Sequence, residues 1–91
     1  MITRVLTRVR DKNRTDIVDQ AVSDMRALRL RQGLSQERLG IRSGVAMQSI
    51  SQIEQGLRNP TIRTLEKLVA ALGYRVVVQI VAIEPKGKES D

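Results

Sequence analysis

The sequence predicts a small, mainly α protein in which four to five helices are followed by one C-terminal β-strand. Apolar residues recur at helical spacing from Asp16 to about Gly73. The pattern then changes, because residues 74–83 are almost wholly apolar and rich in β-branched side chains, as strands are. The 91 residues include one aromatic side chain, Tyr74, so the core must consist of aliphatic side chains and methionine, which suits small packed helices.

Composition excludes several classes of function. The chain has no cysteine and no histidine, so it has neither a thiolate zinc site nor the usual general base. We therefore expect no catalytic site, no metal site, no cofactor and no small-molecule substrate. No apolar run approaches the roughly 18–20 residues of a membrane span, and no signal peptide is recognisable, so we expect a cytoplasmic protein. The net charge of +6 indicates an anionic partner, with nucleic acid as the default candidate.

The basic charge is concentrated in residues 1–14, which we call the N-terminal arm. The arm holds five basic side chains and one acidic side chain, a local net charge of +4. Its apolar residues fit a helical stripe at Ile2, Val5, Leu6 and Val9, but residues 3–9 also alternate as a strand would. The conformation of the arm is therefore left open. Because the arm lacks a large apolar face, binding to a membrane surface is a poor alternative.

The first helix is expected to begin near Asp16 and to end at Gly33, a suitable C-cap. Acidic residues lie in its early turns and arginines in its last turns, as the helix dipole favours. A second helix should begin after Ser35, which is a good N-cap, and end near Ser43 and Gly44. The apolar stripe of the first helix is Ile17, Val18, Ala21, Val22, Met25 and Leu28.

A third helix is expected over about Met47–Gln55, where Gly56 stops it. Pro60 disfavours helix at the residue before it, and Thr61 can cap a fourth helix that closes at Gly73. The inner stripe of this fourth helix should be Ile62, Leu65, Leu68, Val69 and Leu72.

Two short helices joined by a tight turn with glycine, and packed on a longer helix, outline a helix-turn-helix. The motifs R-x-x-x-G-L-S-Q, S-G-V, I-x-x-I-E-x-G and N-P-T occur in order within residues 25–73. This stretch resembles the repressor-type helix-turn-helix domain (XRE family) of lambdoid phage repressors and many bacterial antitoxins. One departure is Gly40, where the family usually has alanine. Glycine preserves a close helix crossing there but costs about 1 kcal/mol of helix propensity.

The resemblance implies that the third helix enters the DNA major groove and contacts bases. Glutamine can form two hydrogen bonds with adenine, serine can bond several bases, and methionine can pack on thymine methyl groups. Ile50 and Ile53 should point away from the DNA into the core. The alternative is that the polar side chains of this helix are merely solvated. The implied base-contacting residues are Met47, Gln48, Ser49 and Gln52.

Further positions correspond to phosphate contacts in the family, and each arginine among them could release about one counterion. Ser35 is first of all a helix cap, and any single arginine could equally be a solvated surface residue. Arg29 and Glu54 match a family pair in which a salt bridge ties the first helix to the end of the third. The expected phosphate-contacting residues are Ser35, Gln36, Arg42, Ser51, Arg58, Asn59 and Arg63.

The strand predicted over residues 74–84 would leave backbone groups unpaired on both edges. Two-fold pairing with the same strand of a second subunit is the simplest remedy, and pairing with residues 2–9 of the same chain is the alternative. Pro85 should end the strand, and residues 85–91 are expected to form a disordered tail. The expected dimerisation residues are Val76, Val77, Val78, Ile80 and Val81.

A C-terminal strand after four helices resembles the HipB-like antitoxins, which dimerise through a small intersubunit sheet, repress their own operon and bind a kinase toxin, HipA. The domain order is then the arm, a DNA-binding domain over residues 15–73, a dimerisation strand and a tail. The expected function is a repressor that binds a palindromic operator in double-stranded DNA as a homodimer and is the antitoxin of a HipBA-like system. The alternative is a regulator of prophage or restriction-controller type that has no toxin partner.

Overall fold

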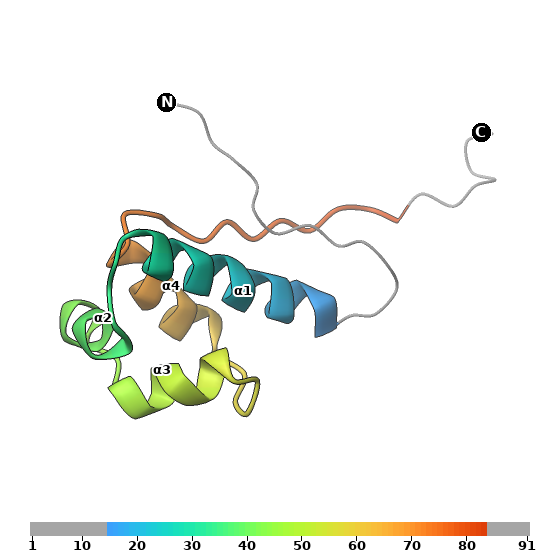
Figure 1. The fold of residues 1–91 in the computed structure, drawn as a ribbon. Coiled ribbons are helices and arrows are strands. Elements are labelled where there is room, and N and C mark those ends of the chain that lie inside the picture. The colour runs from blue at the N-terminus through green and yellow to red at the C-terminus, as the bar shows by residue number, and fades with distance from the viewer. Residues whose placement is uncertain (1–14, 84–91) are drawn as a thin grey trace, which may run out of the picture.

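The computed structural model describes residues 15–83, which fold into four α-helices (Figure 1). The prediction of a mainly α protein is confirmed. The longest helix, α1, contacts both α3 and α4, and α2 packs against the same two helices. The helices are α1 (Thr15–Arg31), α2 (Gln36–Ser43), α3 (Met47–Glu54) and α4 (Ile62–Ala70).

Local sequence signals set the ends of these helices. The Ser35 hydroxyl accepts a hydrogen bond from the Arg38 backbone N–H, and the Thr61 hydroxyl does the same for Thr64, both at 3.0 Å. Both residues therefore act as the N-caps that the sequence predicts. The turn from α2 to α3 requires a left-handed residue, and Gly44 supplies it with φ of 80°.

The core lies between the four helices and is wholly aliphatic apart from methionine. Ile50 and Ile53 of α3 are 0% and 2% exposed, which confirms that they point inward. Two residues of the predicted stripes were assigned wrongly, because Ile17 and Ile62 lie in the first turns of their helices at the rim of the core and are about half exposed. The buried apolar residues are Met25, Leu28, Leu34, Leu39, Ile50, Ile53, Leu65, Leu68, Val69 and Leu72.

Gly40 is the point where the helix-turn-helix is packed most closely. A Cβ atom added there would lie 2.8 Å from the backbone carbonyl oxygen of Val45 and 3.4 Å from the backbone nitrogen of Met47. Both atoms belong to the chain that leads from the turn into α3, so neither can rotate away. The turn therefore packs directly on the backbone of α2, and the alanine expected from the resemblance would displace it.

Residues 74–83 do not form the predicted β-strand within the described single chain. They follow α4 as an extended segment along the edge of the molecule opposite α3 (Figure 1). Val76 packs against the core, whereas the apolar residues after it are between 62% and 94% exposed. A strand needs a neighbouring strand for its backbone hydrogen bonds, and residues 15–83 provide none. The arm, its alternative pairing through residues 2–9, residue 84 and the predicted tail lie outside the described residues.

Candidate nucleic-acid interface

Helix α3 has one face fixed to the core and one face open to solvent. Because Ile50 and Ile53 are buried, the side chains on the far side of the helix must project outward. Met47 and Gln48 are exposed at the start of the helix, and Ser49 and Gln52 are half-buried. The structure thus brings the four predicted base-contacting residues onto one short helix at an edge of the molecule (Figure 1).

The polar groups of α3 differ in how they are engaged. Within residues 15–83 the amides of Gln48 and Gln52 form no hydrogen bond, so they keep both donor and acceptor groups available. The hydroxyl of Ser51 accepts a hydrogen bond from the Gln55 amide at 2.8 Å. The hydroxyl of Ser49 accepts one from the Arg58 guanidinium at 3.0 Å. The last contact crosses from the helix to the loop that follows it.

Four of the predicted phosphate-contacting residues lie in the segments that precede and follow α3. Arg42 is exposed in the last turn of α2, just before the turn into α3. Arg58 and Asn59 are exposed in the loop after α3, and Arg63 is exposed in the first turn of α4. Gln36 differs, because its amide nitrogen points inward and donates a 2.9 Å hydrogen bond to Glu54.

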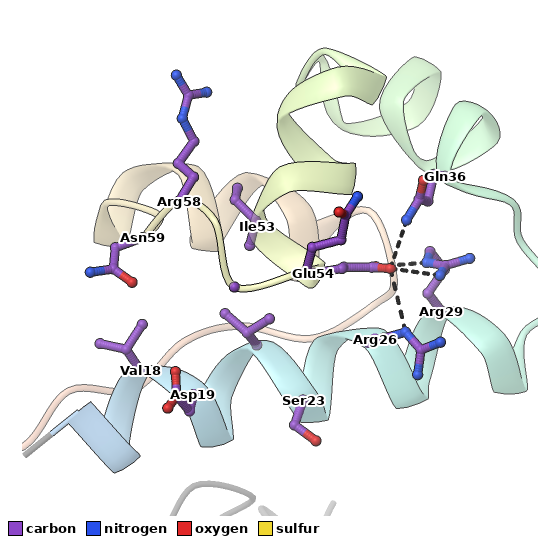
Figure 2. A pocket seen from close by; sticks show the side chains of 13 residues that line it. Val18, Asp19, Ser23, Arg26, Arg29, Gln36, Ile53, Glu54, Arg58 and Asn59 are labelled. Carbon is purple, nitrogen blue, oxygen red and sulfur yellow. Dashed lines mark hydrogen bonds and ion pairs between the residues drawn. The ribbon is translucent and has the colours of Figure 1, made fainter. Parts of the chain in front are cut away.

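The buried carboxylate of Glu54 anchors the inward side of α3. Arg29 of α1 donates two hydrogen bonds to Glu54, at 2.8 Å from Nε and 2.7 Å from Nη2 (Figure 2). It donates a third, at 2.8 Å from Nη1, to the Leu34 carbonyl. The two side chains are 7% and 3% exposed. The fork geometry matches the planar guanidinium to the carboxylate. The pair predicted from the resemblance thus lies in bidentate contact, linking α1, the turn after it and α3.

Sequence reasoning missed two members of this cluster. Besides Arg29, Glu54 contacts Gln36 of α2 and Arg26 of α1, whose Nε lies 3.6 Å from Oε1 (Figure 2). Arg26 could have been found, because it precedes Arg29 by one helical turn and therefore lies on the same face of α1. No sequence signal distinguishes an inward-turned Gln36 from one that faces DNA.

The environment of Glu54 has opposing effects on its pKa. Burial of the carboxyl group raises the pKa, but hydrogen bonds from Arg29 and Gln36 and the charges of Arg29 and Arg26 outweigh this effect. The net result is a pKa below the ordinary value. The carboxyl group therefore stays ionised in the folded protein under neutral conditions and keeps its charge pair.

This shift predicts an acid-sensitive contribution to stability. Because the folded pKa of Glu54 is lower than the unfolded value of 4.5, its stabilising effect is complete above that pH and is lost as pH falls through the folded value. Glu54→Gln should be less stable than wild type at pH 7, and the difference should shrink as pH falls from 5 to 3. Urea denaturation across that pH range measures the difference in free energy of unfolding between the two proteins. The other carboxyl groups affect both proteins equally and therefore cancel in this difference. A difference that stays constant with pH would contradict the prediction.

Neither a metal-binding cluster nor a membrane-spanning helix occurs among the described residues. Within residues 15–83 no cluster of acidic residues could hold a metal ion. None of the four described helices is long and apolar enough to cross a membrane.

Comparison with known proteins identifies the architecture. A family model described as helix-turn-helix matches residues 25–78. An uncharacterised HTH-type transcriptional regulator of Sinorhizobium fredii, y4dJ, is 47% identical over 51 residues, which cover 56% of this chain and 66% of the relative. An uncharacterised HTH-type transcriptional regulator of Haemophilus influenzae is 36% identical over 66 residues, which cover 71% of this chain and 63% of the relative.

The chain thus spans just under two thirds of the length of these two relatives. No solved structure matches it. The matched range contains the C-terminal part of α1, the whole of α2, α3 and α4, the turn with Gly44, and Val76 and its neighbours. The family model and the geometry of the helices agree, and the chain therefore belongs to the XRE-type helix-turn-helix family.

Proposed function

We propose that this protein is a sequence-specific transcriptional regulator that binds double-stranded DNA through α3. One observation carries the proposal: α3 is anchored from behind by Ile50, Ile53 and Glu54, while hydrogen-bonding side chains occupy its open face. A helix held in this way can enter the major groove without losing its packing. The names of the two relatives, both HTH-type transcriptional regulators, support the same function.

Phosphate contacts on either side of α3 would hold it in the groove. Arg42 and Ser35 would contact the backbone before the helix, and Asn59 and Arg63 after it, with Ser51 and the free amide oxygen of Gln36 as further candidates. The basic arm would add charge to the same interface. Since about half or more of protein–DNA hydrogen bonds go to phosphate and sugar, these contacts would set the register of α3.

The base contacts can be tested by shortening the two free amides. Gln48→Ala and Gln52→Ala should each weaken binding by about 1–3 kcal/mol on the duplex that the wild-type protein enriches from a randomised library. Both should change binding to random DNA little, because phosphate contacts dominate there. Fluorescence anisotropy measures both affinities, and Gln20→Ala on α1 is the matched control. Equal losses on the two DNAs would show that these amides do not determine sequence preference.

We further propose that the active species is a homodimer joined through residues 74–83. The support is the unusual exposure of apolar side chains in this extended segment, from 62% at Val78 to 94% at Ile80. Two-fold pairing would cover these side chains together with Val77 and Val81, and would satisfy backbone groups on one edge. Because the segment lies at the edge opposite α3 (Figure 1), pairing would leave α3 open.

The finer proposal is that the protein is a HipB-like antitoxin that represses its own operon and binds a HipA-like kinase toxin. The apolar segment favours it, because its exposed side chains offer a protein-binding surface beside the DNA-binding helices. The competing proposal is a prophage or restriction-controller regulator without a toxin. A kinase-like reading frame next to the gene, whose product co-purifies with this protein after co-expression, would support the antitoxin. Absence of such a reading frame would favour the prophage or restriction-controller regulator.

A further inference from the structure

We propose that Arg58 recognises a guanine base in the operator and that Ser49 orients its guanidinium group for this contact. The inference rests on the proposed DNA-binding function and changes the role of Arg58 within it. From the sequence, Arg58 is expected to contact phosphate. The structure places its guanidinium on the base-facing helix instead, through the hydrogen bond from Nη1 to the Ser49 hydroxyl at 3.0 Å.

The course of the chain after α3 explains how residues nine positions apart meet. The Gly56 N–H donates to the Ile53 carbonyl at 3.1 Å, and the Leu57 N–H donates to the Gln52 carbonyl at 2.9 Å. Gly56 adopts a left-handed φ of 82°, which reverses the chain at this point. The loop is thereby tied to the last turn of α3, and Arg58 starts from a fixed position next to that helix.

The direction of the side chain agrees with this assignment. Arg58 and Asn59 both belong to the loop that borders an open groove against α1. The Arg58 side chain nevertheless points away from α1, where Val18 and Asp19 lie (Figure 2). The guanidinium therefore lies on the side of α3 and not in the groove.

The contact to Ser49 positions the guanidinium without neutralising it. Arg26 and Arg29 share the carboxylate of Glu54, but within the described part of the chain Arg58 forms no ion pair. Asp19 borders the same groove and does not pair with it. A guanidinium has five N–H donors, and one bond to a neutral hydroxyl leaves the charge and the other donors available.

The remaining hydrogen-bonding groups match one base better than the others. Arg58 offers only donors, and Ser49, whose oxygen accepts from Arg58, can donate its own O–H. Guanine presents two acceptors, N7 and O6, to the major groove, whereas adenine presents one acceptor beside a donor and cytosine presents a donor. A set of donors fixed next to α3 therefore favours guanine.

Arginine-to-lysine substitutions separate base recognition from phosphate binding, because lysine keeps the charge and loses the two-pronged geometry. The probe is the duplex that the wild-type protein enriches from a randomised library, together with its single-base-pair variants. Arg58→Lys should weaken binding to the enriched duplex by about 5- to 150-fold and remove the preference for guanine at one base pair. Its salt dependence should stay unchanged. Arg31→Lys, the matched control at an exposed arginine in the last turn of α1, outside the expected interface, should bind as wild type does.

Replacing that guanine by 7-deazaguanine removes the N7 acceptor. The change should weaken binding of the wild-type protein and leave binding of Arg58→Lys unchanged. Ser49→Ala should reduce preference at the same base pair, and combining it with Arg58→Lys should add little further loss, since both act on one contact.

Two results would overturn the inference. If Arg58→Lys keeps the affinity and base preference of the wild type, while Arg58→Ala weakens binding to all sequences and lowers the salt slope by about 0.9, Arg58 contacts phosphate. If the library yields no enriched sequence for the wild-type protein, the proposed function itself fails, which is distinct from failure of the role of Arg58 alone.

Discussion

Replacing Arg29 by methionine should lower the free energy of unfolding by about 3–5 kcal/mol, because it leaves the Glu54 carboxylate buried without its main partner. Glu54 is 3% exposed as a side chain, so water cannot replace the two lost hydrogen bonds. The Leu34 carbonyl would lose its donor as well. A domain of this size has roughly 5–15 kcal/mol of stability, so the variant should lose a large fraction of it. Urea denaturation followed by circular dichroism measures the loss.

Two further variants test whether the loss of stability comes from the unpaired buried charge of Glu54. Arg29→Met combined with Glu54→Met should recover much of the lost stability, because removing both charges removes the desolvation penalty. Arg26→Ala should cost less than about 1 kcal/mol, since Arg26 is 55% exposed and lies 3.6 Å from the carboxylate. A loss as large for Arg26→Ala as for Arg29→Met would contradict the assignment of the bidentate pair as the main stabilising contact.

The parts of the fold that local chemistry determines could be predicted from the sequence. Ser35 and Thr61 were expected to cap helices, and each accepts a backbone hydrogen bond three residues on. Ile50 and Ile53 were expected in the core, and both are buried there. Their spacing of three residues places them on the same face of a helix. The regular apolar spacing predicted the helices well but failed at Ile17 and Ile62, because periodicity does not show where neighbouring helices end.

The parts that depend on tertiary contacts could not be predicted. Gly40 is required by the approach of the Val45 carbonyl, which is a distance across a turn that sequence does not reveal. Gln36 was assigned to phosphate from its position, whereas its amide nitrogen contacts Glu54. The position of the Arg58 guanidinium against Ser49 depends on how the chain reverses at Gly56.

The conformation of the C-terminal segment also depends on contacts that the sequence does not reveal. Its composition predicts a strand, yet residues 74–83 have no strand partner in the described single chain. The composition of residues 74–83 shows that they can form a strand when a partner strand is present. Whether a partner is present depends on the assembly and not on the single chain. The proposed dimer therefore has to be tested in solution.

Val78→Asp should convert the protein to a monomer. Val78 is 62% exposed in the single chain, so the charge costs the isolated domain little, whereas a two-fold sheet would bury it. Side chains alternate along an extended segment, and Val76 packs on the core, so Val78 should share the inward face and Gln79 should lie on the other. Val78→Pro independently tests the sheet, because it removes a backbone donor from the ladder.

The loss of the dimer should have a larger effect on DNA binding than any single contact. One recognition helix contacts only a few base pairs, and specific binding usually takes two half-sites about 34 Å apart. Without the second subunit, affinity for the operator should fall about 100-fold or more, because the second binding event is no longer intramolecular. Sedimentation velocity should show a monomer whose helical circular dichroism matches the wild type. A Val78→Asp protein that stays dimeric would place the interface elsewhere, most plausibly on α4. A monomer that still binds tightly would show that operator recognition does not need the dimer.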